Sequence, residues 1–235
     1  YNKSIPVVTI GRMAGQYGKP RSNLMEGDYF SYRGDNINGY ELENREPDPE
    51  RLISGYLHSA STMNFIRTLE SSNYYDINFI ENTGKINKKY EDIVEDIKKA
   101  LIFNSSELST EFFISHEGMH LEYEEQFVRT DSKTHKQILT STHFPWIGER
   151  TRQLDGAHVD FFKDIDNPVG IKVSHNADVE EISKIIETLN PSNESGKIVI
   201  IIRMGVDNIE EHLARILQLN KSYNLTWISD PMHGN

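Results

Sequence analysis

The sequence contains no cysteine, which excludes disulfide bonds and thiolate metal ligands within these 235 residues. It is also poor in basic residues, since 25 lysines and arginines stand against 36 aspartates and glutamates, for a formal net charge of −11. This negative balance argues against nucleic acid or an anionic membrane surface as the main partner. The longest uninterrupted aliphatic run, residues 198–202, is far too short to cross a bilayer. We therefore expect a cytoplasmic protein, or a plastid protein if the source is a plant.

Six short apolar runs have the length and the residue types of buried strands. They lie near residues 6–11, 111–115, 144–148, 168–173, 197–203 and 225–229. Amphipathic patterns with helical spacing occupy residues 49–71, 90–101, 179–189 and 207–217, and Asp207 with Glu210 has the form of an N-terminal capping box. From residue 111 onward strands alternate with helices or connections, which predicts a parallel sheet. The length suits one sizeable core, so we expect a single domain over residues 1–235.

Ionisable residues stand at the carboxyl end of each predicted strand, or just after it. They are Arg12, His116, Glu149, Lys172, Arg203 and His233. Buried strands gain no stability from such groups, because an unpaired buried charge costs several kcal/mol. In a β/α barrel the carboxyl ends of the strands form the catalytic face, whereas the GxGxxG loop typical of a dinucleotide-binding doubly wound sheet is absent. The pattern favours an α/β fold of the TIM-type (β/α)8 barrel class, represented here by about six parallel strands. A purely structural ion pair is the alternative interpretation of Glu149 with Arg150 or Lys172.

A glycine-rich turn follows the first predicted strand and carries Arg12, Lys19 and Arg21 within ten residues. Such a turn lets backbone N–H groups and cationic side chains approach an anion together, although a solvated basic loop has the same composition. If the strand ends converge, these cations join others in one pocket around Glu149 and His233. A pocket of this kind selects small substrates that carry phosphates or carboxylates. The polar segment 26–48 that follows is too long for an ordinary connection, which is typical of a functional or a disordered loop.

The residues His116, Glu117 and His120 match the short HExxH pattern of zinc hydrolases. On a helix this spacing would place both imidazoles on one face with the glutamate beside them. Here the pattern follows a predicted strand, and Gly118 weakens a helix at that point. A zinc hydrolase is therefore only a remote alternative.

Seven blocks of sequence, in order and across nearly the whole chain, resemble the class II (plant-type) 3-deoxy-D-arabino-heptulosonate 7-phosphate (DAHP) synthases. They are Arg12-Met-Ala-Gly-Gln-Tyr-Gly-Lys-Pro-Arg-Ser22, Arg33-Gly-Asp35 with Asn38-Gly-Tyr40, Ser115-His-Glu117, the run from Trp146 to His158, Asn167-Pro-Val-Gly-Ile-Lys172, Arg203-Met-Gly205 and Asp230-Pro-Met-His-Gly-Asn235. The resemblance implies a transferase that condenses phosphoenolpyruvate with erythrose 4-phosphate and releases phosphate. This reaction opens the shikimate pathway to chorismate and the aromatic amino acids. A related synthase that uses an amino-sugar phosphate, and an inactive fragment that only binds, are the alternatives.

The resemblance also implies a role for each matching residue. Phosphoenolpyruvate would contact Arg12, Trp146, Gly148, Glu149, Lys172 and Arg203, and erythrose 4-phosphate would contact Lys19, Arg21, Ser22 and Arg150. Glu149 and Lys172 would be the catalytic pair. His233 would be a ligand of a divalent metal, with Mn²⁺ the first choice and Co²⁺ or Mg²⁺ as alternatives.

The family's other metal ligands, a cysteine and two carboxylates, belong to segments that this chain does not contain. The six strands would then be the second to seventh of the family barrel. We expect an internal portion of a longer, homo-oligomeric synthase that alone binds metal poorly and turns over little.

Overall fold

The structure is a computed structural model that describes residues 8–12, 18, 21, 23–71, 92–93, 95–96, 99 and 112–233. The chain divides into two compact units, which are described separately. One unit comprises residues 10–59 and 113–235, and the other comprises residues 1–9 and 60–112. In the second unit the description is confined to residues 8–9, the latter part of helix α1 (Glu50–Ser71), the helical residues 92–93, 95–96 and 99, and the first residue of a strand at 112. All that follows concerns the first unit unless stated otherwise.

Six strands form one sheet in the order β1-β4-β7-β8-β9-β10. Their bounds are β1 Thr9–Arg12, β4 Phe112–Glu117, β7 Phe144–Ile147, β8 Val169–Val173, β9 Ile198–Ile202 and β10 Leu225–Ser229. Each pairing from β4 to β10 is parallel, and each strand lies beside the next sheet strand along the chain. A doubly wound sheet reverses this order at a switch point, whereas barrel strands follow one another in sequence. The sheet therefore has the topology of part of a TIM-type barrel, which confirms the predicted fold class.

Smaller elements surround the sheet. The helices are α4 Leu121–Glu125, α5 Ala157–Phe162, α6 Val179–Leu189 and α7 Val206–Leu217, with short 3-10 turns at Leu42–Asn44 and Gln218–Lys221. Two antiparallel hairpins pair β2 Met25–Glu26 with β3 Tyr29–Phe30, and β5 Val128–Thr130 with β6 Gln137–Leu139. Among the residues that the structure describes, no helix is long and apolar enough to cross a membrane.

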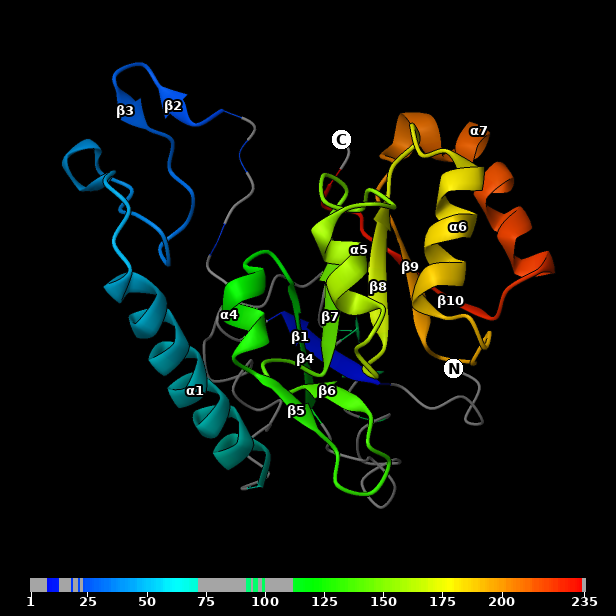
Figure 1. Ribbon diagram of the computed structural model, residues 1–235, viewed down its shortest axis with the longest axis horizontal. Helices are drawn as coiled ribbons and strands as arrows, with labels where there is room; N and C mark the ends of the chain where they lie inside the picture. Colours follow the sequence, from blue (N-terminus) through cyan, green and yellow to red (C-terminus); the bar gives the residue numbers. More distant parts are fainter. Residues whose placement is uncertain are drawn as a thin grey trace. The chain divides into compact units, whose positions relative to one another are not determined.

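One face of the sheet is covered by helices α5, α6 and α7 (Figure 1). Side chains along a strand alternate between its two faces, so every second residue points toward these helices. On β8 and β9 these are Val169, Ile171, Val173, Ile198, Ile200 and Ile202, all buried. Helix α6 meets them with Ile182, Ile185, Ile186 and Leu189, which recur at helical spacing on one face. This layer is the main core, and it fixes the register of the strands that carry the site.

The opposite face of the sheet holds a second, smaller cluster of Phe144, Trp146, Val199 and Ile201, each 6–7% exposed. Gly170 lies among them, because a Cβ at that position would come within 2.8 Å of Ile201 Cδ1 and of Trp146 Cβ. A side chain there would push the indole or the isoleucine aside. The charged end of β8 belongs to this same face, since Lys172 follows Gly170 by two residues.

The predicted secondary structure is confirmed for all six strands and for helices 49–71, 179–189 and 207–217, within one to three residues at the ends. The predicted cap of the last helix is wrong. Helix α7 begins at Val206 after Gly205, whose φ of 71° suits glycine, and Asp207 lies in the first turn instead. The apolar face of α1 is also less buried than its spacing suggests, because Ile53 is 54% exposed.

Candidate functional site

A pocket of about 370 Å³ opens on the face of the sheet opposite the helices, toward the carboxyl ends of the strands. Its lining combines apolar residues of the smaller cluster with polar residues from β1, β4, β8 and β10. Four of the residues predicted for substrate or metal binding line it, namely Arg12, Trp146, Lys172 and His233. Residues as far apart in the sequence as 12 and 233 therefore meet at one pocket.

Two cations lie over the indole ring of Trp146. The guanidinium carbon of Arg12 lies 5.2 Å from the ring centroid, and the ammonium nitrogen of Lys172 lies 5.5 Å from it. Both distances fall within the range of cation–π attraction, which offsets part of the repulsion between the two like charges. Trp146 is 6% exposed, and its Nε1 donor is buried with no hydrogen-bond partner among the described residues. Two positive charges thus lie at a pocket sized for a small anion.

Asp230 links Lys172 to His233. Its Oδ2 accepts a hydrogen bond from Lys172 Nζ at 2.9 Å and lies 2.8 Å from His233 Nδ1. The carboxylate and the ammonium are mostly buried, with side chains 14% and 12% exposed. Burial by itself would raise the pKa of Asp230, but the hydrogen bonds from Lys172 and His233 outweigh it and lower that pKa to about 2. Asp230 is therefore held as a carboxylate between the two predicted functional groups.

The depressed pKa of Asp230 predicts a specific loss of stability in acid. A carboxylate whose pKa is lower in the folded state stabilises the fold above its unfolded value near 3.8, and this contribution is lost as pH falls toward 2. A difference of nearly two units corresponds to about 2 kcal/mol. Between pH 4 and pH 2, the free energy of unfolding of the parent chain should fall by about that much more than that of Asp230→Asn. Urea titrations at several pH values would measure this, and parallel curves for the two proteins would contradict it.

Asp230 also determines which ring nitrogen of His233 is open to a metal. Because Asp230 engages His233 Nδ1, the Nε2 atom of the ring is left for coordination, which is the usual arrangement around a metal-bound histidine. Within the described part of the chain, no group of three histidine, aspartate or glutamate side chains is placed to hold a metal ion. The metal role of His233 therefore stays a prediction.

Glu149, predicted as the second catalytic residue, follows β7 and is held by one neighbour in its own turn and by one that follows β8. Its Oε1 accepts hydrogen bonds from Arg152 Nη2 at 3.0 Å and from Ser174 Oγ at 2.9 Å. Arg152 also donates from Nη1 to Glu181 Oε2 at 2.7 Å. Burial acts to lower the pKa of Arg152, but the two glutamates outweigh it and raise that pKa. Glu149 stands at the strand ends but outside the lining of the pocket that holds Lys172.

Gly148 and Arg150 follow β7, and Arg203 follows β9, at the carboxyl ends of these strands. Gly148 packs against Glu117, and a Cβ at Gly148 would come within 2.1 Å of the Glu117 Oε1 atom. Arg203 continues β9, with its backbone N–H donating to Val173 O at 2.9 Å, and its Nε is buried with no hydrogen-bond partner among the described residues. Arg150 is exposed, and it and Arg203 lie outside the pocket lining. Lys19 and Ser22 lie outside the described residues, so their predicted contacts stay predictions.

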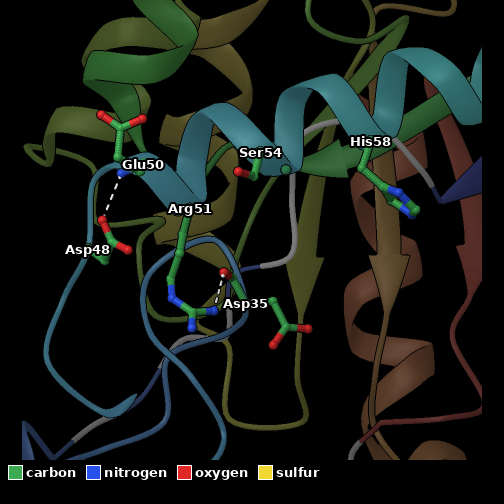
Figure 2. Close-up of a pocket in the computed structure, with 7 residues that line it drawn as sticks. Asp35, Asp48, Glu50, Arg51, Ser54 and His58 are labelled. Carbon is green, nitrogen blue, oxygen red and sulfur yellow. Dashed lines mark hydrogen bonds between the residues drawn. The ribbon is translucent and has the colours of Figure 1, made fainter.

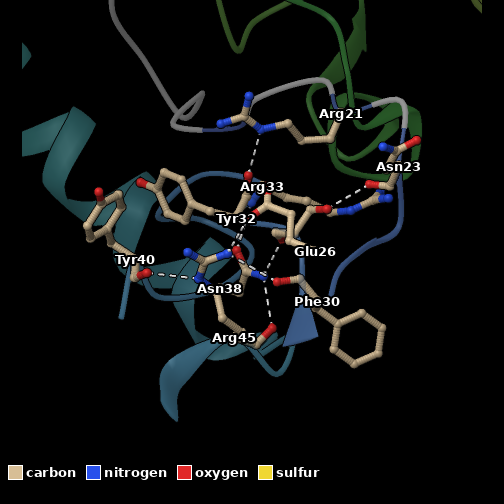
Figure 3. A network of polar contacts seen from close by, with 10 residues as sticks. Arg21, Asn23, Glu26, Phe30, Tyr32, Arg33, Asn38, Tyr40 and Arg45 are labelled. Atoms are coloured by element: carbon tan, nitrogen blue, oxygen red, sulfur yellow. Dashed lines mark hydrogen bonds and ion pairs between the residues drawn. The ribbon is translucent and has the colours of Figure 1, made fainter. Parts of the chain in front are cut away.

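The long segment 23–48 is ordered around Asn38, which is fully buried (Figure 3). The Asn38 amide donates to the carbonyl oxygens of Ser31 and Arg45, both at 2.9 Å, and its oxygen accepts from Arg33 N at 2.9 Å. One side chain thus satisfies three backbone groups of a segment that has little regular structure. Of the two interpretations of this segment, the disordered one is wrong.

A second side chain, Arg45, ties the ends of this segment together. Its guanidinium donates to Tyr40 O at 2.8 Å, to Phe30 O at 3.1 Å and to Glu26 Oε2 at 3.1 Å. Arg21, predicted to bind erythrose 4-phosphate, is attached to the same framework by a bond of 3.0 Å from its Nε to Tyr32 O. The side chain of Arg21 is thereby held through its Nε, and its contact with erythrose 4-phosphate stays a prediction.

Replacing Asn38 with leucine is expected to loosen the whole segment that supports Arg21. The change keeps the volume but leaves three buried backbone groups unsatisfied, at about 1–3 kcal/mol for each. Amide hydrogen exchange in residues 31–45 should accelerate strongly, whereas exchange in the strands of the sheet should change little. Asp28→Ala, an exposed change in the turn between β2 and β3, is the control. Equal protection in the parent chain and in Asn38→Leu would contradict this structural role.

A second pocket, of about 500 Å³, lies where the segment 33–48 meets the start of α1 (Figure 2). It is lined by Asp35, Asp48, Glu50, Arg51, Ser54, Gly55 and His58. Asp48 Oδ1 accepts from Glu50 N at 3.0 Å, and Arg51 Nη1 donates to Asp35 O at 3.4 Å. Asp35 Oδ1 also accepts from the Tyr32 hydroxyl at 2.8 Å. These contacts stabilise the beginning of α1, and they account for the charged groups of this hollow.

The HExxH residues do not form the helix that a zinc hydrolase requires. His116 and Glu117 end strand β4, and α4 begins only at Leu121. His116 is fully buried on the side away from the pocket, where its Nε2 lies 2.7 Å from Glu124 Oε1. Burial lowers the pKa of His120, which precedes α4. The two imidazoles therefore do not lie on one face of a helix, and the zinc hydrolase alternative has no support in the structure.

Sequence reasoning missed Asp230, Arg152 and Ser174 as parts of the site. Asp230 and Arg152 lie inside blocks that resemble the DAHP synthases, so the signal existed for them, but no role was assigned. Ser174 directly follows the end of β8, and this position after a strand was the only available signal. The partner of Asp230 lies 58 residues away in the sequence, and the partner of Ser174 lies 25 residues away. Local residue spacing does not reveal contacts over such separations.

Comparison with known proteins agrees with the resemblance. The match to the family model described as the class-II DAHP synthetase family covers residues 1–235. Proteins named phospho-2-dehydro-3-deoxyheptonate aldolase are similar to this chain in three organisms. The Streptomyces coelicolor protein is 41% identical over 258 aligned positions that cover 100% of this chain and 57% of that protein. The Neurospora crassa protein is 38% identical over 98% of this chain and 56% of its own length, and the Mycolicibacterium smegmatis protein is 37% identical over 100% and 56%.

The chain therefore spans little more than half the length of these curated relatives. Its six strands, in barrel order with the predicted residues at their carboxyl ends, agree with a portion of such a protein. The family match extends over every residue from 1 to 235. The chain belongs to the class-II DAHP synthetase family.

Proposed function

We propose that this chain carries part of the active site of a DAHP synthase, which condenses phosphoenolpyruvate with erythrose 4-phosphate. The observation that supports this most directly is the convergence of Arg12 and Lys172 over Trp146 in a small pocket. Arg12 makes no ion pair with the described residues, and such a cation is available for a substrate phosphate or carboxylate. Family membership and the names of the relatives support the same assignment.

In the proposed reaction, Arg12, Lys172 and Arg203 hold the phosphate and carboxylate of phosphoenolpyruvate, with Trp146 and Gly148 beside it. Lys19, Arg21, Ser22 and Arg150 hold erythrose 4-phosphate. The new bond joins C3 of phosphoenolpyruvate to the aldehyde carbon, and Lys172 supplies the proton that the aldehyde oxygen takes up. Water then adds to the cationic C2, Glu149 orients this water and takes its proton, and inorganic phosphate leaves. One molecule of each substrate and one water thus yield the product and phosphate.

His233 is the residue of this chain that we assign to the divalent metal, through Nε2. The metal, when bound, supplies a Lewis acid that polarises the aldehyde carbonyl. Mn²⁺ is the proposed ion. We further propose that the six strands are the second to seventh of the barrel, and that the whole protein is a cytoplasmic homo-oligomer, both on the resemblance alone.

Calorimetry with phosphoenolpyruvate on the 235-residue chain tests the proposal. We expect binding by the parent chain, and at least a tenfold weaker affinity for Arg12→Ala, because a charged hydrogen bond contributes about 1.5–3 kcal/mol. Arg129→Ala removes a cation from β5, outside the pocket, and should leave the affinity unchanged. Absence of binding by the parent chain, or equal affinity of the parent and Arg12→Ala, would refute the proposal.

A second measurement tests whether the chain is catalytically complete. With both substrates and manganese, phosphate release by the isolated chain is expected to be slight or absent, because the chain provides only one proposed metal ligand. Turnover at the normal rate of a synthase would contradict this expectation while supporting the assigned reaction.

A further inference from the structure

The two oxygens of the Glu149 carboxylate have different environments. Oε1 accepts two hydrogen bonds, from Arg152 Nη2 and Ser174 Oγ. Oε2 is buried and has no hydrogen-bond partner among the described residues. A buried carboxylate oxygen without a donor is unfavourable by itself, so an oxygen left in this state calls for a donor other than the described residues, such as a bound water molecule.

Arg152 donates hydrogen bonds to two different carboxylates. An arginine that serves only to neutralise one carboxylate usually takes both of its oxygens in a bidentate pair. Arg152 instead gives one nitrogen to Glu149 and the other to Glu181, and it is itself only 7% exposed. The three side chains carry one positive and two negative charges. The group therefore keeps an excess of negative charge, and Oε2 of Glu149 is the place where a donor is missing.

The three segments that meet here belong to successive βα units. Glu149 and Arg152 lie in the turn after β7, Ser174 follows β8, and Glu181 is in the first turn of α6. Because both donors to Oε1 come from rigid positions next to strands or turns, rotation of the Glu149 carboxylate would break two hydrogen bonds at once. The orientation is thereby set by the fold before any substrate arrives.

We infer that Arg152 and Ser174 are positioning residues for Glu149, which anchor Oε1 and present Oε2 as the acceptor for a water molecule. The inference rests on the proposed function, in which Glu149 takes a proton from attacking water. An acceptor-only oxygen binds a donor such as water and repels the phosphate and carboxylate oxygens of the substrate. The water molecule would thus be held at Glu149, apart from the cations that bind the phosphate and carboxylate groups of the substrate.

A purely structural network makes different demands. Such a network needs charges that balance and segments that stay together, whereas positioning needs donors on one particular oxygen. Four variants separate the two roles. Arg152→Met removes a donor and a charge, Arg152→Lys restores the charge, Ser174→Ala removes a neutral donor, and Glu181→Gln removes the competing carboxylate while leaving both bonds to Glu149.

The experiment is crystallography of the 235-residue chain and of these variants, with attention to the Glu149 carboxylate. In the parent chain an ordered water is expected within hydrogen-bond distance of Oε2, while Arg152 and Ser174 hold Oε1. In Ser174→Ala and in Arg152→Met the carboxylate loses a donor to Oε1, so it should rotate and the water on Oε2 should be displaced or lost. Arg152→Lys should keep part of this order, and Glu181→Gln should leave both the carboxylate and the water in place.

The inference would be overturned by the absence of water at Oε2 in the parent chain. It would also be overturned if the carboxylate and the water were unchanged in both Arg152→Met and Ser174→Ala while the melting temperatures fell, which would leave a structural network. If Arg152→Met fails to fold, Ser174→Ala decides the matter alone, since it disturbs no charge. The crystals contain no substrate, so failure of this test is distinct from failure of the proposed function. If the chain binds no phosphoenolpyruvate in the calorimetric test but the carboxylate and its water respond as expected, the proposed reaction is wrong and the placement of Glu149 stands.

Discussion

Replacing Lys172 with methionine is expected to weaken phosphoenolpyruvate binding by about 30-fold or more and to destabilise the chain. Truncation of one member of a buried, hydrogen-bonded charge pair costs a ligand about 2 kcal/mol or more, which is the factor of 30. The same change leaves the Asp230 carboxylate buried without its ammonium partner, for a stability loss of about 3–5 kcal/mol. His233 still lies beside Asp230 in the variant, so the loss should fall at the lower end. Calorimetry and urea unfolding measure the two effects.

The control for this prediction is a double-mutant cycle with Asp230→Asn. If Lys172 and Asp230 stabilise each other directly, the double variant should lose less stability than the sum of the single variants, by about 0.5–3 kcal/mol. Phosphoenolpyruvate binding should not recover in the double variant, because the cation is still absent. Additive stability losses would show that the 2.9 Å contact contributes nothing, and retained affinity in Lys172→Met would remove Lys172 from the proposed site.

Glu124→Ala is expected to have the largest effect on stability outside the pocket, about 3–5 kcal/mol. Glu124 is 2% exposed and joins His116 of β4 to the loop before β7, since its Oε2 accepts from Ser141 Oγ at 2.5 Å. The alanine removes both contacts and leaves the buried imidazole without its neighbour. Glu124→Gln keeps the shape and an oxygen acceptor, so its loss should be no more than about 1–2 kcal/mol. Thermal and urea unfolding distinguish the two variants.

His120→Ala is the matched comparison, because His120 is the second histidine of the HExxH pattern. For a zinc hydrolase, substitutions at either histidine would abolish metal binding. In the structure only His116 is paired with Glu124, so His120→Ala should cost about 1 kcal/mol, as an average substitution does. Equal and large losses for Glu124→Ala and His120→Ala would contradict the assignment of the Glu124 contact to His116.

The strand positions and the convergence of their ends were predictable because each strand has a recognisable local sequence pattern. An apolar run such as 198–202 has few other structural uses, and a charge directly after it, such as Arg203, indicates an end that faces a site. The sequential strand order then follows from the alternation of strands and helices. For the same reason helix α6, with apolar residues at regular spacing and Asn190-Pro191 behind it, was predicted at the observed bounds.

The contacts inside the site are not indicated by any local sequence pattern. A lysine on β8 and an aspartate after β10 give no sign that they pair, because each is equally compatible with solvent. The segment 23–48 lacks periodicity, and its order depends on Asn38 and Arg45 bonding to backbone groups, which any asparagine or arginine in a polar region has the chemistry to do. The cap of α7 was mistaken because Asp207 and Glu210 satisfy the capping pattern, whereas the observed cap lies two residues earlier, at Gly205.

The two tryptophans of the sequence lie on opposite faces of the sheet, so the fluorescence of each would report on a different face. Trp146 faces the pocket beneath two cations, whereas Trp227 packs against the helix-covered core and donates from Nε1 to Asn220 Oδ1 at 2.8 Å. In Trp227→Phe the remaining indole emission would report events in the pocket, such as the arrival of an anion that draws the cations from the ring. In Trp146→Phe it would report loosening of the helical layer, so that occupancy and unfolding become separable by fluorescence.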